Sequence, residues 1–205
     1  DKLNSTEQLE PLRALLSNYP GTSLFTGIES YRWVNEATPY SRKTTDGLSQ
    51  FEAYNAGALI DQFGTHDFYH KSKLVPGGET LPWFLRFMDS WFEKFGGVTA
   101  GYAKQNDRNV LEEKNGIKLA PAICYESIYG DFLRHYVKKG ANLITIITND
   151  GWWKNTPGHI QHFHYAKLRA IETGCWVARS ANTGISGFIN PKGAVIEAKG
   201  YGEAA

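Results

Sequence analysis

The stretch at residues 117–128 constrains the fold of this chain more than any other. It begins with the apolar run Ile-Lys-Leu-Ala-Pro-Ala-Ile, which predicts a buried strand, and a polar turn follows at Cys124. The end of a buried strand is where α/β folds commonly expose catalytic groups. A lone cysteine is more often a small structural residue than a nucleophile, so the other motifs must decide between these two interpretations.

The hydrophobic pattern predicts helices and strands in a mixed order. Helical periodicity covers residues 6–17, 81–95, 128–139 and 159–173. Short apolar or alternating runs predict strands at residues 23–28, 51–60, 65–69, 109–111, 117–124, 141–148, 175–180, 185–190 and 194–198, with a long surface loop at residues 30–50. This mixture of hairpins and helices predicts an α/β sandwich with sheets inside and helices outside.

Length and composition limit the classes of function. The 205 residues are enough for one domain with a buried core, and the net charge of +1 gives no reason to expect nucleic acid. The sequence holds no apolar run of about 18 residues, the length that predicts a transmembrane helix. Aromatic side chains gather at residues 81–95, where they could form a core face, an apolar ligand wall or a membrane-touching face.

A second motif bears on the role of Cys124. Residues 69–79 read Tyr-His-Lys-Ser-Lys-Leu-Val-Pro-Gly-Gly-Glu, so Lys71 follows a predicted strand and Glu79 follows a turn. A lysine near the thiol would supply a cation that could stabilise both a thiolate and a developing oxyanion. The other cysteine, Cys175, lies in an apolar run and is most simply a core residue. The pairing of Lys71 with Cys124 favours nucleophilic catalysis.

Three histidines suggest a metal site as an alternative. His159, His162 and His164 are close in the sequence. On a helix His159 and His162 share a face, whereas His164 points away from His162. No neighbouring cysteine or carboxylate completes a zinc set. The spacing therefore argues against a metal at this position.

Taken together, these motifs resemble the nitrilase superfamily of carbon–nitrogen hydrolases, and within it the apolipoprotein N-acyltransferases. The matching segments occur in family order at residues 69–79, 123–126, 148–153, 161–162, 169–172 and 179–187. The sequence Leu-Val-Pro-x-Gly-Glu separates the acyltransferases from ordinary amidases, although Gly77 stands where the family often has Phe. The resemblance implies one catalytic domain over residues 1–205 with an incomplete nitrilase-like α-β-β-α sandwich.

The resemblance also implies a role for each candidate residue. Cys124 is the expected nucleophile, Lys71 the residue that stabilises the tetrahedral oxyanion, Glu79 and Glu126 supporting acids, and Tyr125 and Trp152 substrate-pocket residues. Each has a plainer alternative: Glu79 could only brace its turn, and Trp152 could only pack against the fold.

One catalytic residue of the family has no counterpart in this sequence. The general-base glutamate ends the family's first strand, ahead of the helix that matches residues 6–17, so it is expected before Asp1. Glu29 could substitute for it but follows the wrong strand. The family's transmembrane helices and final strands are likewise expected outside these residues. The 205 residues alone are therefore predicted to be inactive.

The implied reaction is an acyl transfer without a metal or organic cofactor. A phospholipid donates its acyl chain to Cys124 as a thioester, and the N-terminal amine of a diacylglyceryl-cysteine lipoprotein then accepts it. The implied setting is the bacterial inner membrane, with the catalytic domain facing the periplasm. Two alternatives stay open: a nitrilase-type amidase that uses water as acceptor, and a non-catalytic binding domain of the same fold.

Overall fold

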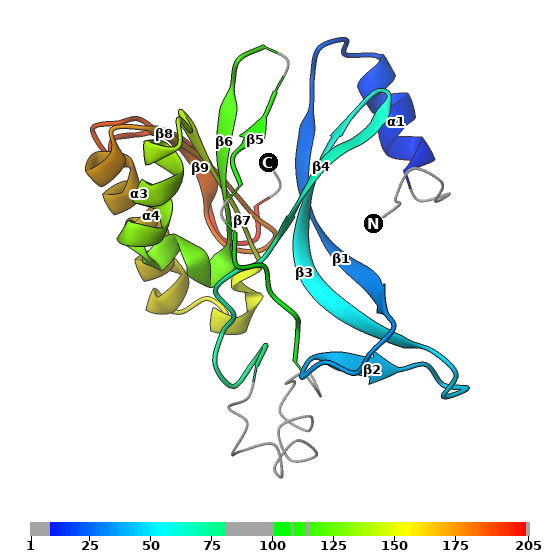
Figure 1. Cartoon of the computed structure of the whole chain (residues 1–205). Helices are drawn as coiled ribbons and strands as arrows, with labels where there is room; N and C mark the ends of the chain where they lie inside the picture. Colours follow the sequence, from blue (N-terminus) through cyan, green and yellow to red (C-terminus); the bar gives the residue numbers. More distant parts are fainter. Residues whose placement is uncertain (1–8, 81–100, 108, 114, 204–205) are drawn as a thin grey trace.

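The computed structural model describes residues 9–80, 101–107, 109–113 and 115–203. Within them, the strands form two sheets that face each other, with helices on both outer faces (Figure 1). The first sheet contains β1 (Leu24–Val34), β2 (Ser41–Lys43), β3 (Gln50–Asp61) and β4 (Gly64–His70). In this sheet β3 pairs with the other three strands, all of them antiparallel to it.

The hairpin between β3 and β4 is closed by the side chain of Asp61. Its Oδ1 accepts hydrogen bonds from the backbone amides of Phe63 at 2.7 Å and Gly64 at 3.1 Å. Gly64 has φ of 130°, a conformation that residues with a Cβ rarely adopt. The predicted strands at residues 51–60 and 65–69 are thus joined by a tight turn at residues 61–64, which directs β4 back toward Lys71.

The second sheet has the strand order β10-β9-β8-β7-β6-β5. Its strands are β5 (Leu111–Glu112), β6 (Lys118–Ile123), β7 (Leu143–Thr148), β8 (Trp176–Ala181), β9 (Ser186–Ile189) and β10 (Val195–Lys199). The strands β6, β7 and β8 are parallel, and the other pairs are antiparallel. Because β5 pairs only with the first two residues of β6, Pro121 lies beyond the paired part of that edge, where proline is tolerated.

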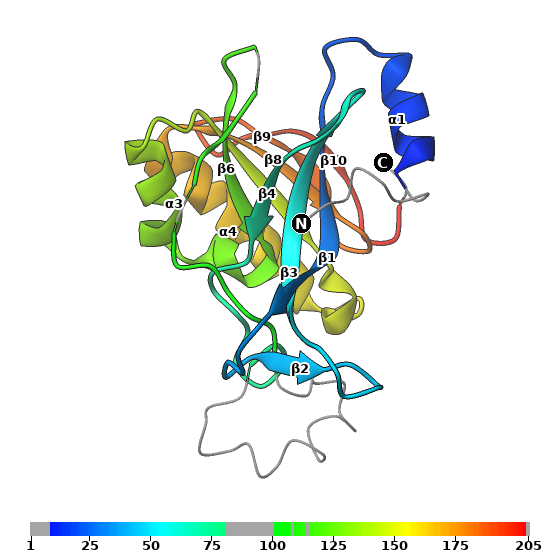
Figure 2. The ribbon, with the colours of Figure 1, turned by 45° about the vertical axis from the view of Figure 1, so that its right-hand side comes forward.

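Helices cover the outer faces of the two sheets. Figure 2 shows α3 (Gly130–Lys138) and α4 (Pro157–Thr173) on the six-stranded sheet and α1 (Glu10–Ser17) on the four-stranded sheet. The helix α4 starts at a Thr156 cap, with Pro157 in its first turn, and ends at left-handed Gly174. This arrangement is the predicted α-β-β-α sandwich.

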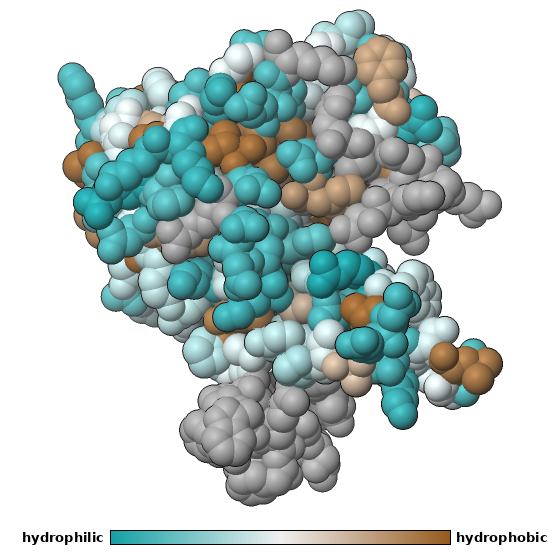
Figure 3. Space-filling model, viewed as in Figure 1, coloured by the Kyte–Doolittle hydropathy of each residue, from teal (hydrophilic) through white to brown (hydrophobic). Residues whose placement is uncertain are grey.

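The two sheets approach each other where the side chains are small. Gly27 on β1 pairs directly with Gly57 on β3, and both face Ile147 of β7. The ring of Phe25 lies over Gly57, where an added Cβ would come within 2.5 Å of it. Figure 3 shows a mostly hydrophilic surface, with apolar residues near the upper middle of that face, where the sheets meet.

Some of the element predictions were wrong or fall outside the described residues. The surface loop predicted at residues 30–50 is interrupted by β structure, because β1 continues to Val34 and β2 forms at Ser41–Lys43. The helix predicted at residues 6–17 is described from Glu10, and residues 6–8 lie outside the described residues. The aromatic helix predicted at residues 81–95 also lies outside them. Among the described helices, none has the length and apolar content that crossing a membrane requires.

Candidate active site

Cys124 lies at a sharp turn directly after β6. The backbone is extended at Ile123, and Cys124 then takes φ of 51°, in the left-handed region, as the 3₁₀ helix η3 (Cys124–Ile128) begins. This conformation costs a non-glycine residue roughly 1–2 kcal/mol, and it persists only where the surroundings hold it. The residue is half-buried, so the thiol is not sealed in the core. The strand end predicted at Cys124 is confirmed.

Glu126 joins this turn to the segment that carries Lys71. Its carboxylate is fully buried and accepts hydrogen bonds from the backbone amides of Ile123 at 2.9 Å, Ser72 at 2.7 Å and Lys73 at 2.9 Å. The Tyr69 hydroxyl donates to it at 2.7 Å. Burial raises the pKa of Glu126, and these hydrogen bonds oppose that effect. The geometry suits a structural brace better than a proton carrier.

Lys71 and Glu79 form a second buried pair. The Lys71 Nζ lies 2.9 Å and 2.8 Å from the two carboxylate oxygens of Glu79, and the lysine side chain is 1% exposed. Glu79 also accepts hydrogen bonds from the side-chain amide of Asn55 at 2.7 Å and from the backbone of Val75 at 2.8 Å. Glu79 therefore does more than brace its own turn, because its carboxylate neutralises and orients the lysine.

Tyr125 and Trp152 lie on the two short 3₁₀ helices. The Tyr125 ring packs edge-on against Tyr129 with centroids 5.2 Å apart, and the side-chain hydrogen bond between them raises the pKa of Tyr129 to about 12. Trp152 belongs to η4 (Asp150–Trp153) and is 73% exposed. An indole this exposed does not serve as core packing, which leaves it free to contact a ligand.

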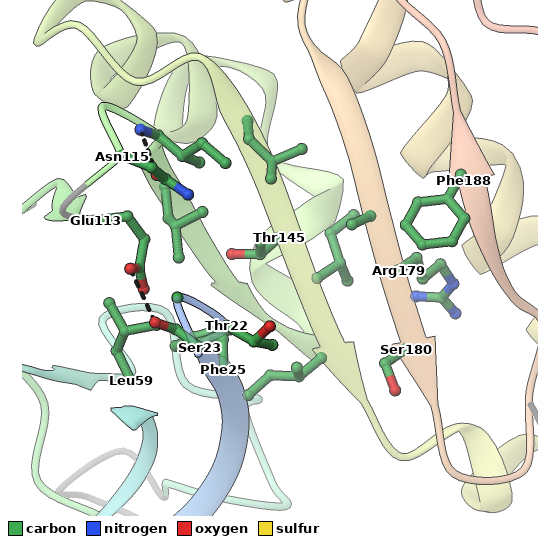
Figure 4. Close-up of a pocket in the computed structure, with 17 residues that line it drawn as sticks. Thr22, Ser23, Phe25, Leu59, Glu113, Asn115, Thr145, Arg179, Ser180 and Phe188 are labelled. Atoms are coloured by element: carbon green, nitrogen blue, oxygen red, sulfur yellow. Dashed lines mark hydrogen bonds between the residues drawn. The ribbon is translucent and has the colours of Figure 1, made fainter. Parts of the chain in front are cut away.

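Two hollows lie near these elements. The larger, a cavity of about 490 Å³ between the sheets, is lined by Phe25, Leu59, Thr145, Ser180 and Phe188 among others (Figure 4). Neither Cys124 nor Lys71 is among its lining residues. The smaller recess, of about 180 Å³, lies beside the backbone that binds Glu126. Its lining residues are Tyr40, Ser72, Lys73, Leu74, Thr80, Lys104 and Tyr129.

The family model for carbon-nitrogen hydrolases matches residues 16–204. The chain belongs to the carbon–nitrogen hydrolase family. Similar proteins include the apolipoprotein N-acyltransferases of Brucella suis, 41% identical over 195 residues, and of Rickettsia bellii, 40% identical over 151 residues. These matches cover 80% and 72% of this chain but only 36% and 29% of the relatives, so the chain spans about a third of their length.

Solved structures of carbon–nitrogen hydrolases confirm the fold. The Caenorhabditis elegans NitFhit protein superposes with a TM-score of 0.65 at 19% identity, covering 95% of this chain and 43% of that one. A Nesterenkonia amidase in complex with butyramide gives 0.59 at 18% identity, covering 93% and 62%. At these identities the likeness concerns the fold alone. It establishes the nitrilase-like sandwich as the scaffold of the candidate site.

The structure adds a buried polar cluster to which the sequence analysis gave no role. Asp150 is fully buried, and its Oδ1 lies 2.8 Å from His162 Nδ1 and 3.0 Å from the Thr148 hydroxyl. Its Oδ2 forms an ion pair with the guanidinium of Arg179, which is also buried. Burial alone would raise the pKa of Asp150, but the hydrogen bond from His162 and the charge of Arg179 lower it below its ordinary value.

The members of this cluster are separated in the sequence, so no local sequence pattern reveals it. Asp150 follows β7, Arg179 lies on the neighbouring parallel strand β8, and His162 belongs to α4, which covers both strands. Each residue lies in a segment that carries the family resemblance, but only the strand order brings them together. The contributions of Asn55 and Tyr69 were missed for the same reason.

The three histidines do not converge on a metal position. His162 binds Asp150, His159 stacks on Tyr201 with ring centroids 4.8 Å apart, and His164 is exposed on the other side of α4. Among the described residues, no three His, Cys, Asp or Glu side chains are grouped as metal ligands would be. His162 therefore has a hydrogen-bonding role.

Proposed function

We propose that the protein containing this chain transfers an acyl group from a phospholipid to the N-terminal amine of a diacylglyceryl-cysteine lipoprotein, through a thioester on Cys124. One observation carries the proposal. The carboxylate of Glu126 binds the segment that follows Lys71 and the turn that holds Cys124, so a buried cation and a strained thiol belong to one braced unit. The acyltransferase names of the similar Brucella and Rickettsia proteins support the choice of reaction.

The first half-reaction forms the thioester. The Cys124 thiolate attacks the ester carbonyl carbon of the phospholipid, and the carbonyl oxygen becomes an oxyanion that the Lys71 ammonium stabilises. When the carbon–oxygen bond breaks, the acyl group stays on sulfur, and the lysophospholipid alkoxide takes the proton that the general base removed from the Cys124 thiol. Glu79, bound to Lys71, keeps the ammonium in place and balances its charge.

The second half-reaction forms the amide. The lipoprotein amine attacks the thioester carbonyl, the carbon–sulfur bond breaks, and the thiolate returns to Cys124 as the amine loses a proton. Tyr125 and the exposed Trp152 are our candidates for contacts with the two substrates. The aromatic residues 81–95 are our candidate for the acyl-chain entry. No metal or organic cofactor takes part in these steps.

A general base completes the proposed site. We place it on a glutamate that precedes Asp1, in a strand added beside β1. Glu29 is the alternative within these residues. It is exposed on β1 directly opposite Asn55, whose side chain binds Glu79, so it shares the sheet face of the Lys71–Glu79 pair. Activity of the 205 residues alone would favour Glu29 and contradict our prediction that they are inactive.

The proposed setting follows from the substrates. A phospholipid donor and a lipidated acceptor both lie in a membrane, so we place the protein in the bacterial inner membrane with this domain on the periplasmic side. Membrane-spanning helices outside residues 1–205 would hold the domain there. Topology mapping of the full-length protein with reporter fusions tests this placement, and a reporter active only in the cytoplasm would contradict it.

Thioester trapping tests the reaction. Full-length protein is mixed with phospholipid vesicles, quenched in acid and analysed by mass spectrometry, and an acyl chain is expected on the peptide that contains Cys124. Cys124→Ala should carry none, and Cys175→Ala should carry as much as the wild type because Cys175 is buried among core residues. Adding a diacylated lipopeptide should then discharge the thioester into an amide. Discharge by water alone would indicate an amidase, and no adduct on intact Cys124 would indicate a binding domain.

A further inference from the structure

The carbonyl group of Cys124 is held from two sides. The Ser127 hydroxyl donates a hydrogen bond to this oxygen at 2.8 Å, and His162 Nε2 lies 3.2 Å from it. Ser127 Oγ and His162 Nε2 are themselves 3.0 Å apart. The Ser127 hydroxyl, the His162 imidazole and the Cys124 carbonyl are therefore in mutual contact beside the strained residue. A left-handed non-glycine residue needs this kind of fixation, because its backbone would otherwise relax.

Asp150 fixes the orientation of the His162 ring. An ionised carboxylate only accepts hydrogen bonds, so the contact of 2.8 Å between Asp150 Oδ1 and His162 Nδ1 places a proton on Nδ1. A doubly protonated ring also donates from Nε2 to the Cys124 carbonyl. In a ring protonated on Nδ1 alone, Nε2 instead accepts the single proton of the Ser127 hydroxyl, which is then not donated to that carbonyl. In both states the imidazole contacts the turn that carries the thiol, through the carbonyl or through Ser127.

Arg179 adds a buried positive charge to the same unit. Its side chain is 0% exposed and pairs with Asp150, and its Nε donates to the carbonyl of Ile185 at 3.1 Å. Its Nη1 has no hydrogen-bond partner among the residues that the structure describes. Burial lowers the pKa of Arg179, while the negative charges of Asp150 and of an ionised Cys124 oppose that effect.

We propose that Asp150, His162 and Arg179 act as one positioning unit for Cys124. In this unit His162 holds the Cys124 carbonyl, Asp150 holds the imidazole, and Arg179 holds Asp150. The unit is separate from the Lys71–Glu79 pair, which acts on the substrate oxyanion. The inference rests on the proposed function only for the identity of Cys124 as the nucleophile.

Two substitutions of His162 test the geometry without removing the buried ion pair. His162→Asn keeps an amide near the position of Nδ1, where it can still bind Asp150 but does not reach the Cys124 carbonyl. His162→Gln extends to the position of Nε2 and restores a donor to that carbonyl. His164→Asn is the matched control, since His164 is an exposed histidine on the same helix.

The first measurement is alkylation of Cys124 by iodoacetamide in the full-length protein, with the modified peptide quantified by mass spectrometry. We expect His162→Asn to lower the second-order rate constant at about pH 7 by roughly tenfold or more, His162→Gln to recover much of that loss, and His164→Asn to match the wild type. A His162→Asn rate constant within about twofold of wild type would overturn the proposal. Equal losses in the Asn and Gln variants would also overturn it, because a space-filling role does not distinguish them.

A second variant keeps the test decisive if the histidine variants unfold. Ser127→Ala removes the other hydrogen bond to the Cys124 carbonyl and leaves Asp150, His162 and Arg179 in place. Slower alkylation in a variant that melts near the wild-type temperature supports the unit, and an unchanged rate constant contradicts it.

The alkylation assay contains no lipid. If the wild type never forms an acyl thioester, the proposed function is contradicted. The relative alkylation rates of the variants still test the positioning unit in that case.

Discussion

The carboxylate of Glu126 lies 2.7 Å from the backbone amide of Ser72, so the turn that carries Cys124 is tied directly to the segment that carries Lys71. The two segments are more than 50 residues apart in the chain, as the sequence separation of Ser72 and Glu126 shows. Their connection depends on one buried side chain. The relative position of the proposed nucleophile and the proposed oxyanion group should therefore respond to any change at Glu126.

Glu126→Gln should be strongly destabilising although it preserves shape. The two carboxylate oxygens accept from the backbone amides of Ser72 and Lys73 on one side and of Ile123 on the other. A glutamine must turn its NH₂ group toward one of these donors, which leaves buried groups unsatisfied and costs about 3 kcal/mol. Tyr69→Phe, the control, removes only one donor and should cost about 1 kcal/mol. Urea unfolding of the full-length protein measures both, and a neutral Glu126→Gln would mean that the carboxyl group is protonated.

Lys71→Met should remove most of the acyl-enzyme formation. The lysine is the buried cation of the braced unit, and losing a group that stabilises an oxyanion typically lowers the rate by roughly 10²- to 10³-fold. Lys43→Met, at an exposed position in the same sheet, should stay within about twofold of wild type. Quenched-flow measurement of the thioester gives the rates. Equal rates for the two variants would remove Lys71 from the mechanism.

The sequence predicts the positions of single residues in this site better than it predicts their partners. Cys124 follows a strand because the apolar run ends there, and Lys71 follows β4 because the turn at residues 61–64 sets the hairpin. Local patterns suffice for both. They do not reveal that Asp150 meets His162, because that contact depends on the order of parallel strands and on the helix that covers them. They also miss β2, whose polar residues pair with β3 without showing an apolar alternation.

Asp150 should make the stability of the protein depend on pH in the acidic range. Its folded-state pKa lies below the ordinary value of 3.8, so its contribution is fully present above that value. As the pH falls further, the unfolded chain binds a proton that the folded state does not, and the contribution is lost. Asp150→Asn should therefore be much less stable than wild type at neutral pH, with a gap that narrows toward about pH 3. Urea unfolding across this range tests it, and a gap that widens on acidification would contradict the ion pair.

Gly57→Ala should be destabilising, whereas Gly27→Ala should be tolerated. The two glycines pair directly, but a Cβ at Gly57 comes within 2.5 Å of the Phe25 ring, and a Cβ at Gly27 only meets Ile147 at 3.5 Å. Overpacking at Gly57 should cost about 1–3 kcal/mol, and the change at Gly27 should stay within about 1 kcal/mol of neutral. Adding Phe25→Leu to Gly57→Ala should recover part of the loss. Equal effects at the two glycines would mean that the Phe25 ring does not lie over Gly57.

Cys124→Gly should give a more stable protein than Cys124→Ala, although both lack the thiol. Alanine keeps the Cβ that makes a φ of 51° unfavourable, whereas glycine adopts this conformation readily and should be ahead by about 1 kcal/mol. Cys175 is the reference position because its φ is not positive. Among the described residues, only Cys124 and Lys154 are non-glycine residues with positive φ. At Cys175, a buried site without positive φ, the usual order should hold and alanine should be the more stable replacement. The same order at both cysteines in urea unfolding would show that Cys124 is unstrained. Opposite orders would show that the turn stores strain at the residue that carries the proposed nucleophile, where Ser127 and His162 hold the backbone in place.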